Sequence, residues 1–238
     1  MKSLVIIAAS LVTAGTALVA ETPQDRLASA ADVFSEVMRT PDKGIPHDLL
    51  ESAQCVVILP GVKKAAFVVG GEYGRGYAEC RNVSGNGWSA PAGVKLEGGS
   101  VGFQIGGSST DLILLVRNRG GMEKLLSDKF TLGGDASVAA GPVGRTAAAE
   151  TDIEMKAEIL AWSRTQGVFA GVSLNGAVLH PDEDVNADLY GNKMSNREIL
   201  MGNTEPPEAA HRLIAELDRY PMHRHGEASR SKPEENHQ

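Results

Sequence analysis

Residues 64–81, KAAFVVGGEYGRGYAECR, combine a short apolar run with a cluster of glycines and three cations. Gly70, Gly71, Gly74 and Gly76 fall within seven positions. Glycine-rich loops that open a helix bind phosphate through their backbone amides. A nucleotide site is therefore the first chemistry that this stretch must be tested for.

The order of the glycines does not fit either common nucleotide loop. A Walker loop places lysine and a hydroxyl residue after its last glycine, but Tyr77 and Ala78 follow Gly76 here. A dinucleotide loop reads GxGxxG before a helix, whereas Gly71, Gly74 and Gly76 read GxxGxG before the strand-like YAECR. The stretch instead predicts a glycine-rich hairpin turn, with Arg75 at its tip.

Other catalytic and metal-binding patterns are also incomplete. The acidic stretch 180–188, HPDEDVNAD, begins like a calcium loop, but Ala187 replaces the glycine and Lys193 the final glutamate. The six histidines form no zinc-type spacing, and no serine lies in a GxSxG elbow. We therefore expect a solvated acidic loop at 180–188, no metal, no cofactor and no enzymatic activity.

Cys55 and Cys80 are the two cysteines of the chain. Both lie in expected strands, with room for a hairpin between them. In an exported protein an even number of cysteines favours a disulfide, and two buried free thiols are the alternative.

Four cations define the candidate binding site: Lys63, Lys64, Arg75 and Arg145. If they converge, they could hold a phosphate or a lipid headgroup together with glycine amides. The alternative is scattered surface charge. The net charge of −7 argues against nucleic acid as a partner, since phosphate neutralisation needs concentrated Lys and Arg.

The two ends of the chain differ from the rest in composition. Residues 1–20 carry Lys2, an apolar stretch and small residues, which is the pattern of a secretory signal peptide; an uncleaved anchor is the alternative. Residues 226–238 are polar and predict a disordered tail. We therefore expect one domain over 21–225, located in the periplasm or secreted.

Hydrophobic periodicity predicts helices at both ends of this domain and strands between them. Thr22, Pro23 and Asp25 predict a capped helix start, and apolar residues at helical spacing follow. Segments 55–60, 100–107 and 111–116 read as strands, and 154–162 with 167–179 as a hairpin. Helices are expected at 46–53, 121–127, 195–201 and 206–220. The predicted class is α+β, a glycine-rich antiparallel, barrel-like sheet with flanking N- and C-terminal helices.

A series of motifs resembles the SYLF domain family, which includes bacterial exported proteins and eukaryotic lipid- and actin-binding proteins. The series is VILPGVKKAAFVVGGEYGRG, GWSAP, GGSVGFQIGGSSTDLILLV, FTLGGDASVAAGPVGR, QGVFAGVSLNGAVL and NADLYG, over about 53–191. The resemblance implies binding rather than catalysis. Lys64 and Arg145 match basic positions of the family motifs.

The resemblance also implies partners. Its eukaryotic members bind phosphoinositides, and some bind actin. A signal peptide here argues against cytosolic actin, and the weakly basic N-terminal helix favours another anionic phospholipid. We expect an exported protein that binds an anionic lipid or membrane surface. The alternatives are a structural or protein-interaction module of the envelope, and a hydrolase with a non-obvious site.

Overall fold

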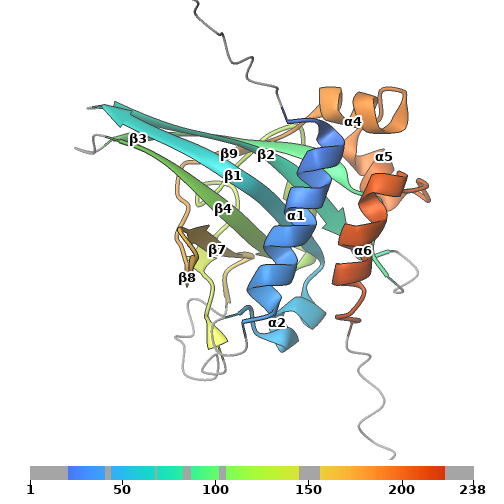
Figure 1. Cartoon of the computed structure of the whole chain (residues 1–238), viewed down its shortest axis with the longest axis horizontal. Helices are drawn as coiled ribbons and strands as arrows, with labels where there is room; N and C mark the ends of the chain where they lie inside the picture. Colours follow the sequence, from blue (N-terminus) through green and yellow to red (C-terminus); the bar gives the residue numbers. More distant parts are fainter. Residues whose placement is uncertain are drawn as a thin grey trace, which may run out of the picture.

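A computed structural model gives the fold over residues 21–40, 44–67, 69–82, 87–101, 106–144 and 156–222. Long strands form one curved sheet, and the first two helices and the last helix pack against its outer face (Figure 1). The first half of the chain forms α1 (Pro23–Met38), α2 (His47–Ser52), β1 (Cys55–Phe67), β2 (Val69–Cys80), β3 (Ala92–Val101), β4 (Gly106–Val116) and α3 (Arg119–Leu125). The second half forms β5 (Phe130–Thr131), β6 (Val138–Ala140), β7 (Ile159–Thr165), β8 (Val168–Gly171), β9 (Val178–Pro181), α4 (Glu183–Tyr190), α5 (Asn196–Met201), the 3₁₀ turn Glu208–Ala210 and α6 (His211–Leu217).

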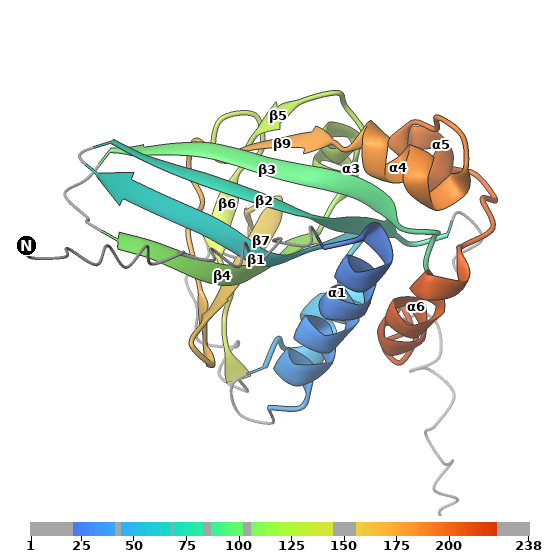
Figure 2. The ribbon, with the colours of Figure 1, turned by 45° about the horizontal axis from the view of Figure 1, so that its top comes forward.

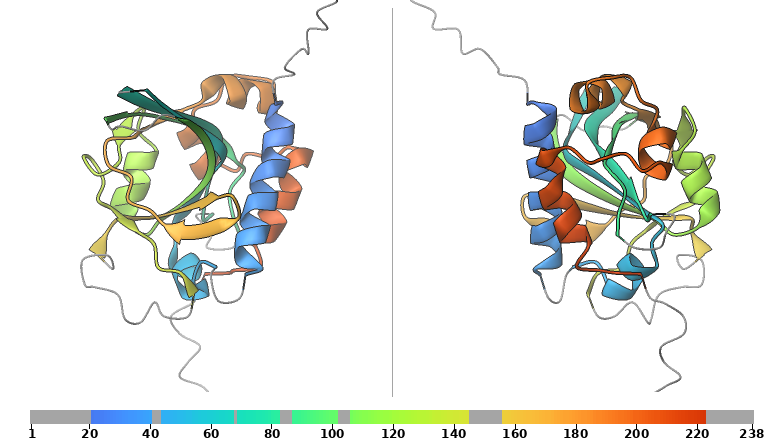
Figure 3. Two further views of the ribbon diagram at one scale, coloured as in Figure 1. Left: turned by 60° about the vertical axis from the view of Figure 1, so that its left-hand side comes forward. Right: turned by 90° about the vertical axis from the view of Figure 1, so that its right-hand side faces the viewer.

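The sheet confirms the predicted fold class. Its order is β5-β9-β3-β2-β1-β4-β7-β6, with β8 paired to β7. Every pairing between these strands is antiparallel except that of β6 with β7. The sheet curls into an open half-barrel, which Figure 3 shows end-on. The predicted hairpin of the C-terminal half is β7–β8, which begins five residues later than the expected segment 154–162. Its second strand is shorter than the expected 167–179, because it ends at Gly171 and residues 178–181 form β9, which pairs with β3.

The glycines of the opening motif lie elsewhere than predicted. The chain reverses where Phe67 pairs with Val69, before the glycines, which lie within β2. A Cβ at Gly76 would lie 2.0 Å from the carbonyl oxygen of Ile58, and one at Gly74 would lie 2.5 Å from a methyl of Val62. Gly76 is required by the close approach of the β1 backbone and Gly74 by the Val62 side chain, not because the chain turns.

An irregularity in β1 explains this close approach. The pairing register of β1 shifts between Ile58 and Lys63 against β2, and between Leu59 and Val62 against β4. Gly61 lies in this bulge with φ +60°, a left-handed conformation that favours glycine. Bulges increase strand twist and bend, which is consistent with the curl of the sheet.

Each face of the sheet contributes to a separate apolar core. Side chains inside the curl form the inner core with α3 and α5, and it contains Leu59, Leu96 and Leu114. Side chains on the outer face form the outer core with α1, α2 and α6, and it contains Phe34, Ile58 and Trp162. Alternate residues of β1 therefore face different cores, as strand geometry requires.

The N-terminal helix follows its predicted pattern. The Thr22 side chain accepts a hydrogen bond from the Asp25 amide, and the Asp25 carboxylate accepts one from the Thr22 amide. Leu27, Phe34 and Val37 are buried against the sheet. The apolar face of α1 is thus used in the fold, as expected.

The prediction of a solvated acidic loop at 180–188 is wrong for most of that segment. Residues 178–181 form β9, and α4 begins at Glu183. Asp182 and Asn186 are buried, and the side-chain oxygen of Asn186 accepts a hydrogen bond from the Gly93 amide. The predicted signal peptide (1–20) and disordered tail (226–238) lie outside the described residues.

Candidate functional site

The four strands β1 to β4 extend well past the helices at one end of the sheet (Figure 2). We call this region the sheet end; its residues are 63–67, 69–73, 97–101 and 106–109. Two of the four predicted cations, Lys63 and Lys64, lie in it on β1. Because neighbouring strand residues point to opposite faces, these two lysines cannot contact one ligand from the same side of the sheet.

Lys63 lies on the outer face, and its side chain is exposed. Its ammonium group donates a hydrogen bond to the Ser109 hydroxyl at 3.0 Å. In register, Lys63 pairs with Tyr73, which pairs with Glu97 on β3. Tyr73 is 46% exposed, so an aromatic ring lies between a cation and an anion on this outer face.

A polar cleft separates Lys63 from the start of α1. Its volume is about 410 Å³, and its walls include Glu21, Asp32, Lys63, Asp111 and Arg164. Acidic side chains outnumber basic ones in this lining. The cleft therefore does not extend Lys63 into a basic patch.

Asp111, in the lining of this cleft, connects residues from different strands through hydrogen bonds. Its carboxylate accepts a hydrogen bond from the Gly61 amide at 2.8 Å and one from Arg164 Nε at 2.8 Å. Burial raises the pKa of Asp111, while the Gly61 amide and the Lys63 charge act in the opposite direction. Arg164 also pairs with Glu36 of α1. These contacts link the bulge of β1 to β4, β7 and α1, and their role is structural.

Lys64 lies on the inner face and is paired with an acid. Its ammonium group lies 3.1 Å from the Glu72 carboxylate, which is opposite it on β2. The side chains are 39% and 15% exposed. An anion that binds Lys64 must compete with Glu72.

Arg75 does not lie at a hairpin tip, as its place in the motif predicts, but in the middle of β2. Its guanidinium group binds both carboxylate oxygens of Asp182, at 2.8 and 3.2 Å. Asp182 is 2% exposed. Arg75 is therefore committed to holding the start of α4 on the sheet. The fourth predicted cation, Arg145, lies outside the described residues.

The sheet end carries few side chains beyond these. Gly71 pairs with Gly99 on the outer face, and Gly98 lies opposite Glu72 on the inner face. A Cβ at Gly99 would meet no atom within 4 Å. Phe67, Val69 and Val101 occupy the last register positions, Phe67↔Val69 and Val69↔Val101. This end of the sheet is thus rich in glycine, and its last paired residues are of apolar types.

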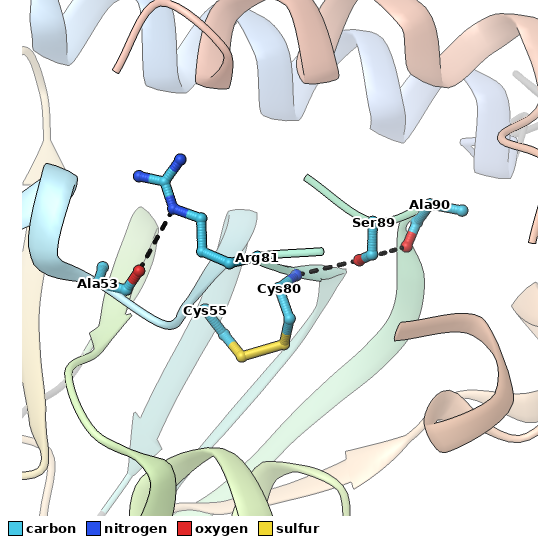
Figure 4. The surroundings of a disulfide bond; sticks show 6 residues. All are labelled: Ala53, Cys55, Cys80, Arg81, Ser89 and Ala90. Carbon is cyan, nitrogen blue, oxygen red and sulfur yellow. Dashed lines mark hydrogen bonds between the residues drawn. A yellow bond between two sulfur atoms is a disulfide. The ribbon is translucent and has the colours of Figure 1, made fainter. Parts of the chain in front are cut away.

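The opposite end of β1 and β2 is cross-linked. Cys55 and Cys80 form the predicted disulfide, and both are fully buried. Figure 4 shows the hydrogen bond of the Cys80 amide to the Ser89 hydroxyl, and Arg81 reaching the Ala53 carbonyl. The link fixes the register at the helix-covered end of the sheet.

One buried acid was not singled out by the sequence. Glu79, on the outer face of β2, is 2% exposed, and neither carboxylate oxygen has a hydrogen-bond partner among the described residues. Burial, and next the charge of Asp218, raise its pKa well above the ordinary value. Strand alternation alone could have predicted that Glu79 lies on the same face of β2 as Tyr77. It could not have predicted that Glu79 is buried, because the helices that cover this face come from distant parts of the chain.

Two further observations limit the chemistry. Among the described residues, no cluster of three or more His, Cys, Asp or Glu side chains could hold a metal ion. In the same part of the chain, no helix combines the length and apolar character needed to cross a membrane.

Comparison with known proteins agrees with the fold and the motifs. The profile of the Ysc84 family, described as "Las17-binding protein actin regulator", matches residues 97–220. An SH3 domain-containing protein of Schizosaccharomyces pombe is 37% identical over 177 residues, which cover 73% of this chain and 41% of the relative. LAS seventeen-binding protein 3 of Saccharomyces cerevisiae is 33% identical over 180 residues, 74% of this chain and 39% of the relative.

A human relative extends the comparison. SH3 domain-containing YSC84-like protein 1 of Homo sapiens is 33% identical over 181 residues, 76% of this chain and 52% of that protein. The chain thus spans about half or less of the length of these relatives. With its motifs, its half-barrel sheet and these matches, the chain belongs to the Ysc84 family, whose domain is the SYLF domain.

Proposed function

We propose that this protein is a non-catalytic binding module that attaches to anionic phospholipid surfaces through its sheet end. The observation that carries the proposal is the projection of β1 to β4 past the helices, with Lys63 and Lys64 next to an apolar finish at Phe67, Val69 and Val101. Apolar residues at a protein tip partition into a bilayer, and adjacent lysines meet the headgroups.

Lys63 is the cation best placed for a headgroup. Its neighbour along the chain, Lys64, is bound to Glu72, and Arg75 is bound to Asp182. Lys63 instead contacts a neutral hydroxyl, so an anion can bind it without separating an ion pair. The exposed Tyr73 ring beside it is of the type that favours the membrane interface.

Location in the periplasm or outside the cell is part of this proposal. It rests on the signal-peptide pattern of residues 1–20 and on the disulfide, since disulfides persist in oxidising compartments. The surface bound would then be an envelope or extracellular membrane leaflet.

Vesicle co-sedimentation tests the proposal. Purified protein should sediment with phosphatidylglycerol-containing vesicles at low ionic strength and less with purely phosphatidylcholine vesicles. Lys63→Ala should reduce the partition coefficient about fivefold, since a lysine near an anionic surface contributes about 1 kcal/mol. Lys64→Ala should have a smaller effect, because Lys64 is already paired with Glu72 and a headgroup must compete with that carboxylate. Arg145→Ala tests the remaining predicted cation.

Lys193→Ala is the matched control. Lys193 is exposed between α4 and α5, at the end of the molecule away from the sheet end (Figure 2). Absence of binding to anionic vesicles at low salt contradicts the proposal. Equal losses for Lys63→Ala and Lys193→Ala would contradict the assigned surface.

A protein partner is the second candidate. It is supported by the family description and by the name of the yeast relative, which refer to Las17 binding. Cross-linking in the native envelope that captures one defined protein, with no lipid bound to the purified chain, would favour this function over the first. Mass spectrometry of molecules extracted from natively purified protein distinguishes the two.

A further inference from the structure

The outer face of β2 holds an acid in an unusual position, beneath the helices that cover the sheet. Glu79 is 2% exposed and lies opposite Val56 of β1. Both of its carboxylate oxygens lack a hydrogen-bond partner among the described residues. A buried ionised carboxylate without a partner is strongly unfavourable, so the folded state requires Glu79 to hold a proton.

The charged and titratable groups around this position come from several elements. They are Tyr77 on β2, Arg81 just after β2, Arg26 on α1, Glu51 on α2, Tyr190 on α4 and Asp218 at the end of α6. Asp218 is the neighbour whose charge acts on Glu79. Burial lowers the pKa of Arg81 to about 10, so Arg81 stays cationic in neutral solution and offsets Asp218. Glu79 is left without a cation of its own.

The helix that carries Asp218 is weakly held. α6 has seven residues and no side-chain cap at its N-terminus, so it depends on tertiary packing. Leu213 and Leu217 bury its apolar side in the outer core. Figures 1 and 3 show α6 lying beside α1 on the outer face.

Two polar contacts complete the docking of α6. Arg81 donates a hydrogen bond of 2.8 Å to the Tyr220 carbonyl just after the helix. Arg212 pairs with Asp32 of α1 in an exposed ion pair, a type of contact that contributes little. A negative charge introduced at Glu79 would therefore act on an element with a small margin of stability.

We propose that Glu79 makes the docking of α6 dependent on pH: the helix lies on the sheet while Glu79 is protonated and detaches when Glu79 ionises. Ionisation of Glu79 adds a second negative charge near that of Asp218 at the end of the helix. Detachment allows water to reach Glu79 and exposes the outer core around Phe34 and Leu213. This inference does not depend on lipid binding.

The sign of the effect follows from proton linkage. The pKa of Glu79 is higher in the docked state than in an open state, where it is near 4.5. The docked state therefore binds more protons, and docking loses stability as the pH rises above about 4.5 towards the pKa of the docked state. For one proton, the opening constant increases by up to tenfold for each pH unit in this window.

Hydrogen–deuterium exchange of the full oxidised chain at several pH values tests the proposal. After correction for the intrinsic exchange rate, amides of α6 should lose protection with rising pH, while amides of β1 and β4 remain protected. Glu79→Gln should abolish this dependence, because glutamine has no proton to lose. Glu97→Gln is the matched control, since it alters an exposed acid on the neighbouring β3 and should leave the dependence intact.

A second variant keeps the test decisive if Glu79→Gln does not fold. Asp218→Asn removes a charge that raises the pKa of Glu79 in the docked state, so the loss of α6 protection should begin at the same pH but level off at a lower pH and be smaller in total. Protection of α6 that does not change with pH in the native protein would overturn the proposal. So would an undiminished pH dependence in Glu79→Gln, or a parallel loss of protection in α6 and in β1.

Discussion

Reduction of the Cys55–Cys80 disulfide should lower the free energy of unfolding by about 3.5 kcal/mol. The two cysteines are 25 positions apart, and closing a loop of that length removes about 12 cal/mol/K from the entropy of the unfolded chain in the loop-entropy model. With a urea m-value of about 3 kcal/mol/M, this corresponds to a decrease of roughly 1 M in the unfolding midpoint.

Urea unfolding with and without reductant measures this directly. Both sulfurs are buried, so the folded protein should resist reductant in the absence of urea and become reduced only after unfolding. The double variant Cys55→Ala/Cys80→Ala should unfold at a lower urea concentration and should not respond to reductant. A midpoint that reductant leaves within about 0.2 M of the oxidised value would refute the reasoning, because the link would then not restrict the unfolded chain.

Three further changes test the packing. Gly76→Ala should lower the free energy of unfolding in urea by about 3 kcal/mol or more. The alanine methyl would lie 2.0 Å from the Ile58 carbonyl oxygen, so the backbone must shift. A loss below about 1 kcal/mol would contradict this close approach. Arg75→Met should lower the free energy of unfolding by about 3 kcal/mol, because it leaves the buried Asp182 carboxylate unpaired. Asp182→Asn in the Arg75→Met background should restore part of that loss. No recovery would mean that the unpaired charge is not the cause. Hydrogen bonds from Ser195, the N-cap residue of α5, hold the pKa of Glu198 below its usual range. Hydrogen-exchange protection of α5 should therefore be full above about pH 4.5 and decrease as the pH falls below it, and Glu198→Gln should remove this dependence. Protection of α5 that acid does not change would contradict this prediction.

Local patterns predicted much of the fold. The capping residues of α1, the helices α5 and α6 and the apolar strand segments 55–60 and 111–116 follow from local patterns, because each pattern reports on a short segment and its own environment. The alternating segment 100–107 does not form the single predicted strand: β3 ends at Val101, β4 begins at Gly106, and 102–105 lie outside the described residues. The disulfide was predictable as well, since the signal-peptide pattern predicts export and an even number of cysteines then favours a pair.

Contacts between distant segments could not be predicted in this way. Arg75 and Asp182 are separated by 107 positions, and each belongs to a motif with a plausible meaning of its own, a hairpin tip and an acidic loop. Their ion pair exists because β9 brings the start of α4 beside β3 and β2. Only the sheet order reveals this neighbourhood. The same limit hid Glu79, whose burial depends on helices from both ends of the chain.

Strand alternation changes what the basic motif can mean. Lys63 and Lys64 are adjacent in the sequence and look like one cationic site, but β1 directs them to opposite faces, where one meets Ser109 and the other Glu72. A flat anionic surface that met one face of the sheet would reach one lysine, whereas a surface that met its end could lie close to both. The apolar residue types at Phe67, Val69 and Val101 occupy this same end. For the proposed membrane binding, this geometry favours an end-on approach of the sheet, in which the lysines flank the contact rather than form its centre.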